Sequence, residues 1–149
     1  MKLVIFLFVY IIEALDFQQT LHTINMPLVG GPRWLRLHQA VVFEDKSEGR
    51  LRLLDFMPRE PQSLETAAKL LSFNSVEGIV RAKEISAMPR FGSITKSIEM
   101  NYCDVEALAS KLFESYDLQL SLRSNNCRTF VGVVIEEAYL QQQRRDGLD

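Results

Sequence analysis

The sequence predicts an α+β domain in which a small antiparallel β-sheet packs against helices. Two runs of alternating apolar residues, 35–43 and 50–57, flank a polar turn that ends in Gly49, a pattern typical of a β-hairpin. Apolar residues also recur at helical spacing in three later segments, and each segment follows a residue type favoured at helix N-caps. The three candidate N-caps are Ser63, Asp104 and Asn126. Together, the two periodicities predict a sheet covered by helices.

The composition limits the classes of function. The chain has 149 residues, of which 47% are hydrophobic and 24% charged, as in one globular domain. A net charge of −2 without a Lys/Arg-rich run predicts no nucleic-acid partner. Two cysteines and two histidines form neither a disulfide framework nor an HExxH or CxxC pattern, and there is no Gly-rich phosphate loop. We therefore expect neither a metal nor a cofactor.

Three parts are predicted along the chain: an apolar N-terminal segment and loop at 1–31, the domain at 32–141, and a polar C-terminal tail at 142–149. Residues 3–12 are continuously apolar, but a bilayer-spanning helix needs about 20 residues. A poor signal peptide, an anchor on a membrane surface, and a strand or helix buried in the fold all fit this run. We favour an intracellular location, with membrane association or secretion left open.

The remaining elements follow from local signals. Strands are predicted to begin at Gly78 and at Ser93, with a turn at 88–92 between them, and a short strand is predicted at 118–122. The three helices are predicted to bury one face each. Those faces comprise Leu64, Ala67, Ala68 and Leu71; then Val105, Leu108, Leu112, Phe113 and Tyr116; then Phe130, Val131, Val134, Ile135, Ala138 and Tyr139.

Cys127 is the candidate nucleophile. It follows the N-cap Asn126 and lies three and four residues before Phe130 and Val131, so its sulfur is predicted on the buried side of the first helical turn. The first backbone N–H groups of a helix lack intrahelical partners and carry the positive end of the dipole, which favours a thiolate and can stabilise an oxyanion. The alternative is a small buried cysteine that opens a helix and has no chemistry.

A base and its orienting group are predicted on the hairpin. If Lys46 and Ser47 form the turn, His38 lies directly opposite Asp55 on the neighbouring strand. Such pairs share a face, with Cβ atoms about 4.5–5.5 Å apart, close enough for a carboxylate–imidazole hydrogen bond. The alternative is a solvent-facing Asp beside a half-exposed His. His22, in a stretch without an assigned structure, is the competing third member of a Cys–His–Asp arrangement.

The cysteine motif resembles that of a known family. The motif Asn126-Cys127-x-x-Phe130-Val131 is similar to the Asn-Cys-x-x-Phe-Val motif of lecithin:retinol acyltransferase-like proteins, which include the H-rev107-type phospholipases and acyltransferases. The stretch 37–42 resembles their His-x-Ala strand, and Asp55 stands where they usually carry a second His. Arg128 and Thr129 replace their usual acidic-His pair. The resemblance covers about residues 35–134, and its order of His first and Cys last is that of the circularly permuted NlpC/P60 branch of the papain-like fold.

The residues and the resemblance together predict cysteine-dependent acyl transfer or hydrolysis through a thioester intermediate. Cys127 would be the nucleophile, His38 the general base and Asp55 its orienter, with Asn126 and Arg128 in oxyanion or positioning roles. The expected partner is a small-molecule or lipid acyl substrate (an ester, amide or thioester), and residues 3–12 could contact a membrane surface. Two alternatives remain: an amidase or peptidase of the same fold, and a catalytically silent binding or scaffold module.

Overall fold

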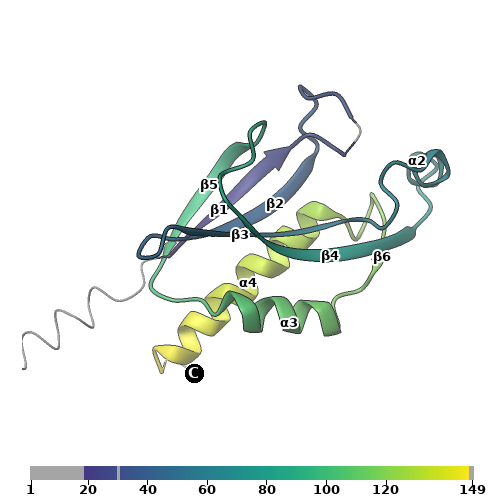
Figure 1. Cartoon of the computed structure of the whole chain (residues 1–149). Coiled ribbons are helices and arrows are strands. Elements are labelled where there is room, and N and C mark those ends of the chain that lie inside the picture. The colour runs from purple at the N-terminus through teal and green to yellow at the C-terminus, as the bar shows by residue number, and fades with distance from the viewer. Residues whose placement is uncertain (1–18, 30, 148–149) are drawn as a thin grey trace, which may run out of the picture.

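Six antiparallel strands form one sheet in the computed structural model of the chain, which describes residues 19–29 and 31–147 (Figure 1). The strand order is β5-β1-β2-β3-β4-β6. The strands are β1 (Gln19–Met26), β2 (His38–Asp45), β3 (Arg50–Pro58), β4 (Val76–Ile85), β5 (Ser93–Met100) and β6 (Gln119–Leu120). The prediction for residues 3–12 lies outside the described residues.

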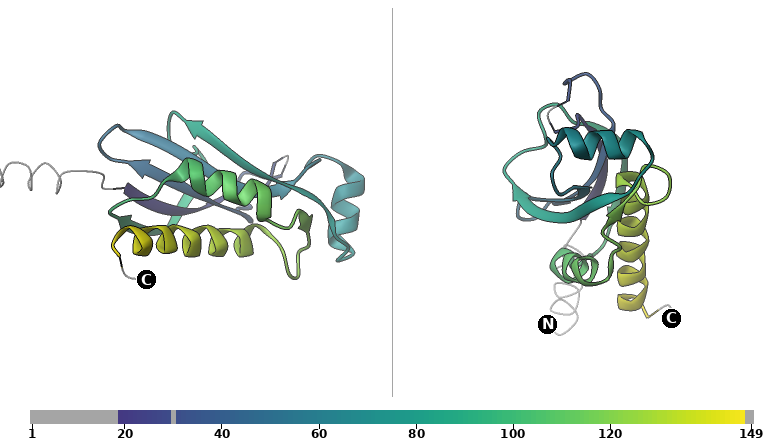
Figure 2. Two further views of the ribbon diagram at one scale, coloured as in Figure 1. Left: turned by 90° about the horizontal axis from the view of Figure 1, so that it is seen from below. Right: turned by 90° about the vertical axis from the view of Figure 1, so that its right-hand side faces the viewer.

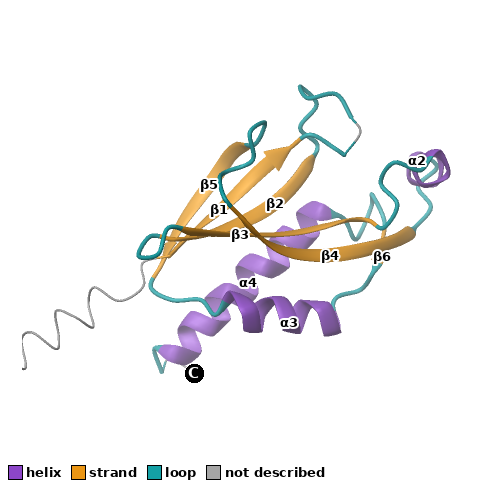
Figure 3. Ribbon diagram, in the orientation of Figure 1, coloured by secondary structure: helices purple, strands orange, loops and turns teal. Residues whose placement is uncertain are grey.

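Three helices accompany the sheet in the described residues: α2 (Leu64–Leu71), α3 (Val105–Ser115) and α4 (Cys127–Arg145). Helices α3 and α4 lie side by side along one face of the sheet, whereas α2 stands apart at one end (Figures 2 and 3). The predicted α+β class, with a small antiparallel sheet packed against helices, is confirmed. None of these helices within the described residues is long and apolar enough to cross a bilayer.

Both predicted boundaries of the domain need correction. Strand β1 lies between β5 and β2, so the domain begins before residue 32 and includes Gln19–Met26. This strand was missed because it buries polar residues (Gln19, Thr20, His22 and Thr23), so its sequence lacks a clear apolar alternation. At the other end, α4 continues through Arg145, beyond the expected end at 141.

The β2–β3 hairpin has a different register from the predicted one. Asp55 pairs with Ala40 instead of His38, because the connection is a four-residue loop and not a two-residue turn. Asp45 accepts hydrogen bonds from the backbone N–H groups of Ser47 and Glu48, and Gly49 takes a positive φ of 65° that closes the loop. The shift of two residues leaves every side chain on its predicted face, because the strand period is also two.

The main core lies between the sheet and the two long helices. Helix α4 contributes Phe130, Val131, Val134 and Ala138, which pack with Val41 and Phe43 of β2 and Leu54 and Phe56 of β3. Burying a large apolar side chain of this kind stabilises the fold by roughly 1.5–3 kcal/mol. Gly78 is required at its position, since a Cβ there would lie 2.4 Å from the Phe56 ring. A smaller cluster of Ile24, Ala40, Val42 and Leu53 covers the opposite face of the sheet.

The predicted helix faces hold for α4 and α3 with exceptions, and fail for α2. In α3, Leu108 and Leu112 are buried as predicted, but Ala109 is buried in place of Phe113, which is half exposed. In α4, Tyr139 is also substantially exposed. Ser63 caps α2 as predicted, yet the helix has no buried residue and its apolar face points to solvent. Periodicity identifies an apolar face but does not supply the neighbour that would cover it.

Candidate functional site

Cys127 is the first residue of α4, and its position is fixed by a capping box. The Asn126 side chain accepts hydrogen bonds from the N–H groups of Arg128 (2.9 Å) and Thr129 (3.2 Å). In return, the Thr129 hydroxyl accepts one from the Asn126 N–H at 2.8 Å. Together these bonds satisfy three backbone donors, hold the start of the helix in a single geometry and leave Cys127 half-buried at its tip.

A second set of hydrogen bonds holds the segment before the helix. The Asn125 side chain accepts from the Tyr116 hydroxyl at 2.6 Å and donates to the carbonyls of Asp117 and Gln119. The Tyr116 ring packs edge-to-face against Phe130 of α4 and also against Phe56 of β3. Contacts of Asn125 and Tyr116 therefore hold the segment before Cys127 against the end of α3, β6 and the aromatic side chains of the core.

His38 lies between Cys127 and Asp55. It is the first residue of β2, and its Nε2 lies 3.0 Å from Oδ2 of Asp55 in β3, so the predicted hydrogen bond is present despite the changed register. The His38 ring and the Cys127 thiol lie close enough for each to shift the pKa of the other. Because Asp55 occupies Nε2, Nδ1 is the ring nitrogen left for the sulfur. The Cys127 sulfur also lies 3.8 Å from the carbonyl oxygen of Leu37, so α4 reaches the backbone at the start of β2.

Arg81 of β4 completes the arrangement, and sequence reasoning missed it. It lies opposite Asp55 in the β3–β4 ladder and donates two hydrogen bonds to its carboxylate, from Nε (2.8 Å) and from Nη2 (2.5 Å). Asp55 has no exposed surface, so this charge-assisted pair compensates much of the cost of burying it. The alternation along β4 places Arg81 on one face, but the long connection from β3 leaves the register of that pair open in the sequence.

The charges of the site favour a thiolate–imidazolium pair. Burial by itself would lower the pKa of His38, but hydrogen bonds and negative charge from Asp55 and Cys127 outweigh it and raise this pKa to about 9. For Cys127, burial opposes ionisation, yet hydrogen bonds from His38 and from the Gln39 N–H, together with the charges of His38 and Arg128, lower its pKa. The pKa of Asp55 is also lowered: burial acts against this, but hydrogen bonds from His38 and Arg81 prevail.

The first turn of α4 offers fewer oxyanion donors than expected. The Asn126 side chain occupies the N–H groups of Arg128 and Thr129, and its own amide donates to the Leu122 carbonyl at 3.1 Å. Asn126 is therefore placed as a positioning residue. The N–H of Cys127 itself has no hydrogen-bond partner among the described residues, so it is the donor left for an oxyanion. The Arg128 side chain is exposed and contributes positive charge near the sulfur.

The structure does not bring His22 into this site. Its ring nitrogens are engaged by Ser97 (Nδ1 to Oγ, 2.7 Å) and by Glu44 (Nε2 to Oε2, 2.8 Å). Because His22 pairs with Val42, four residues along β2 from His38, it belongs to a different part of the sheet. It is a structural histidine that links β1 to β2 and β5.

Cys103 has a different environment from Cys127. It is buried, its sulfur contacts Gln141 at 3.5 Å, and burial, followed by the negative charge of Asp104, raises its pKa to about 12. The pKa values of the two thiols are therefore shifted in opposite directions, and the environment favours ionisation of Cys127 but opposes that of Cys103.

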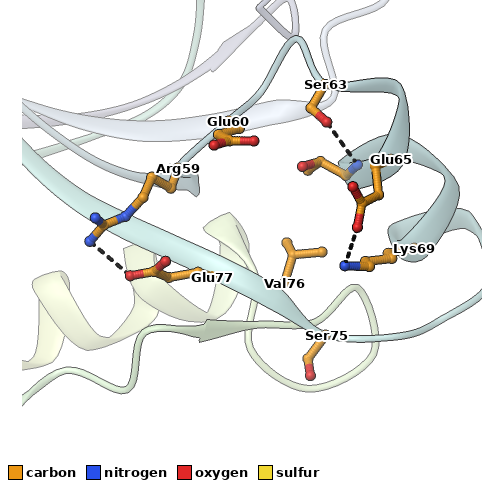
Figure 4. A pocket seen from close by; sticks show the side chains of 9 residues that line it. Arg59, Glu60, Ser63, Glu65, Lys69, Ser75, Val76 and Glu77 are labelled. Atoms are coloured by element: carbon orange, nitrogen blue, oxygen red, sulfur yellow. Dashed lines mark hydrogen bonds and ion pairs between the residues drawn. The ribbon is translucent and has the colours of Figure 1, made fainter.

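Other features of the described surface are separate from the site. Figure 4 shows the side chains that line a hollow between α2 and β4, with the ion pairs Arg59–Glu77 and Lys69–Glu65 at its edges. The hollow has a volume of about 320 Å³. None of the residues that line it belongs to the Cys127 arrangement. Within the described residues, no group of three or more His, Cys, Asp or Glu side chains could hold a metal ion.

Comparison with known proteins returns no relative: no family model, no curated protein and no solved structure matches the chain.

Proposed function

We propose that the chain is a cysteine-dependent acyltransferase or hydrolase, in which Cys127 is the nucleophile, His38 the general base and acid, and Asp55 the orienter of His38. The single observation that carries this is the position of His38, which hydrogen-bonds the buried Asp55 carboxylate and lies close enough to Cys127 for the two side chains to shift each other's pKa. A structural cysteine at a helix start has no need of a buried, charged imidazole.

The first half-reaction follows from this arrangement. The Cys127 thiolate attacks the carbonyl carbon of an ester, amide or thioester, and the carbonyl electrons move to the oxygen, where the Cys127 N–H donates a hydrogen bond. When the tetrahedral intermediate collapses, the bond to the leaving group breaks. The leaving alcohol, amine or thiol takes the proton from Nδ1 of His38, and the acyl group remains on the sulfur as a thioester.

The second half-reaction restores the enzyme. Neutral His38 removes a proton from water or from an acceptor amine or hydroxyl, which attacks the thioester carbonyl. The C–S bond then breaks, and the thiolate and the imidazolium are regenerated together. Asp55 stabilises the imidazolium throughout, and Arg81 keeps Asp55 ionised and oriented. The chemistry is supplied by the thiolate–imidazolium pair alone.

The finer assignment, to the permuted papain-like fold and its lecithin:retinol acyltransferase-like branch, is also part of the proposal. Three features support it: the histidine opens a sheet strand that precedes the cysteine, the cysteine opens a helix packed against that sheet, and the orienting carboxylate lies on the next strand. The capping role of Asn126 gives a physical reason for an Asn before the Cys in the motif.

The test is direct trapping of the acyl-enzyme. The purified chain is incubated with a soluble p-nitrophenyl ester, an acyl-thioester and a phospholipid, and the cysteine peptides are analysed by mass spectrometry. We expect a hydroxylamine-sensitive acyl adduct on Cys127, present in Cys103→Ser and absent in Cys127→Ser. The His38→Ala variant should acylate at least about 100-fold more slowly, the usual contribution of a general base. If no donor acylates Cys127 of the folded protein, the chain is a binding module and not an enzyme.

A further inference from the structure

An exposed cluster of arginines and large apolar side chains lies next to the candidate site. The loop between β1 and β2 contributes Arg33, Trp34, Arg36 and Leu37, and the loop between β4 and β5 contributes Arg90 and Phe91; we call these six residues the arginine–aromatic rim. Trp34 is 79% exposed, far more than a tryptophan with a packing role. The Arg33 guanidinium lies 4.7 Å from the centre of the Phe91 ring, so the two loops are in contact.

The charge of the rim is opposite to that of the chain. The full chain has a net charge of −2, but the segments 27–37 and 86–92 contain three arginines and no Asp or Glu. None of these arginines forms an ion pair with any residue the structure describes. They differ in this from Arg52, Arg59 and Arg81, each of which is paired with a carboxylate. The rim is therefore a local positive surface: Arg33 and Arg90 lie over the Phe91 ring, and no carboxylate of the described residues neutralises the three charges.

One residue of the rim, Leu37, lies beside Cys127. Leu37 is half exposed, directly precedes His38, and its carbonyl oxygen is 3.8 Å from the Cys127 sulfur. Both loops lie at the upper end of the sheet in Figure 1, and the C-terminus of α4 lies at the opposite end of the molecule. A surface that contacts Trp34 and Leu37 would thus bring its molecules to the side of the protein where Cys127 is located.

We propose that the arginine–aromatic rim docks onto an anionic phospholipid bilayer surface and presents Cys127 to the lipids there. Tryptophan is enriched at the boundary between headgroups and acyl chains, and basic residues near an anionic leaflet add about 1 kcal/mol of binding each, or about fivefold in affinity. Three arginines that form no ion pair within the described residues supply the charge complementarity, and Trp34, Leu37 and Phe91 supply exposed apolar surface for insertion. This inference rests on the proposed function and assigns a lipid interface as the source of its acyl substrate.

The experiment measures vesicle binding by the full chain that carries Cys127→Ser, so that the result does not depend on turnover. Cosedimentation is carried out at 0.15 M salt with vesicles of phosphatidylcholine alone and of phosphatidylcholine with 30% phosphatidylserine. We expect the anionic vesicles to bind at least tenfold more tightly. The double variant Arg33→Gln/Arg36→Gln should weaken that binding by roughly 25-fold, and Arg90→Gln by about fivefold.

Matched control variants remove the same kinds of side chain, two arginines and one aromatic ring, at positions outside the rim. The pair Arg144→Gln/Arg145→Gln removes two exposed charges at the far end of α4, and Phe113→Ala removes a half-exposed aromatic ring from α3. Each should change vesicle binding less than twofold, whereas Trp34→Ala should weaken it severalfold. Thermal unfolding of every variant shows that it is folded, and all seven substituted positions are exposed, so the fold should tolerate the changes.

Three results would overturn the docking proposal. Equal binding to neutral and anionic vesicles would assign membrane binding to another segment, such as residues 3–12. If Arg33→Gln/Arg36→Gln weakens vesicle binding no more than the control pair does, the rim is not the docking surface. Tight binding to heparin that is insensitive to Trp34→Ala would make the rim a general polyanion site. Acylation of wild-type Cys127 by the soluble ester is measured separately. Acylation without vesicle binding would reject the docking proposal alone. Vesicle binding without acylation would reject the enzymatic function alone.

Discussion

Replacing Arg81 with methionine tests whether the site depends on a residue that lies across the sheet from the histidine. The substitution keeps most of the aliphatic stem and removes both hydrogen bonds to Asp55, at 2.8 and 2.5 Å. Removing the partner of a buried charge typically costs 3–5 kcal/mol. Here the Arg81 side chain is 34% exposed and Asp55 keeps its bond to His38, so we expect a smaller loss, about 2–3 kcal/mol of unfolding free energy at pH 7.

The assay is urea unfolding of the wild type, Arg81→Met, Asp55→Asn and the double variant. The two residues are in direct contact, so the double-mutant cycle should give a coupling free energy of about 1–2 kcal/mol. Arg59→Met is the matched control, because Arg59 pairs with the exposed Glu77 and its loss should cost less than about 1 kcal/mol. Additive effects of Arg81→Met and Asp55→Asn, or a loss no larger than that of Arg59→Met, would refute the reasoning.

The same pair predicts a pH dependence with a definite sign. The pKa of Asp55 is lowered in the folded protein, so its contribution to stability is present above its unfolded value of about 3.9 and is lost as the pH falls. Arg81→Met removes one cause of that lowering. The difference in unfolding free energy between wild type and variant should therefore be largest near neutral pH and should shrink below about pH 4. A difference that stays constant over this range would mean that Arg81 acts through packing and not through the charge of Asp55.

Three further predictions concern the thiols, the histidine and the helix cap. Iodoacetamide at pH 6.5 should alkylate Cys127 at least tenfold faster than Cys103, because the pKa of Cys127 is lowered and that of Cys103 is raised to about 12. The His38→Ala variant should slow the alkylation of Cys127 alone. Equal alkylation rates for the two thiols would mean that Cys127 is a structural cysteine. The imidazolium of His38 contributes stability that is fully present below its unfolded pKa of about 6.5 and is lost as the pH rises through the folded pKa of about 9. NMR titration should show that Asp55→Asn lowers the folded pKa of His38. An unchanged folded pKa would contradict the orienting role of Asp55. Asn126→Ala should cost about 1 kcal/mol of stability in thermal unfolding and reduce Cys127 alkylation, since the first turn of α4 loses its cap; a reduction in stability without any effect on the thiol would limit Asn126 to a structural role.

Much of the site was predictable because its determinants are local. The N-cap Asn126 and the apolar spacing after it place Cys127 at a helix start, and this depends on one turn of chain. The contact between His38 and Asp55 is present although the predicted register was wrong. A shift of two residues along a strand changes the residue directly opposite Asp55 but keeps both side chains on the same face of the sheet. A shift of one residue would have placed the two side chains on opposite faces.

The sequence by itself determined which segments are strands and helices wherever a strong periodicity is joined to a cap or turn. It also placed the cysteine at a helix start and the histidine and the carboxylate on the same face of the hairpin. Only the tertiary structure decided that Gln19–Met26 is a strand within the sheet, that Arg81 is the partner of Asp55, and that the apolar face of α2 remains uncovered. The physical reason is the range of the interactions involved. Periodicity and capping are set by residues within a few positions, whereas partners across a sheet are selected by the packing of the entire chain, which no short stretch of sequence contains.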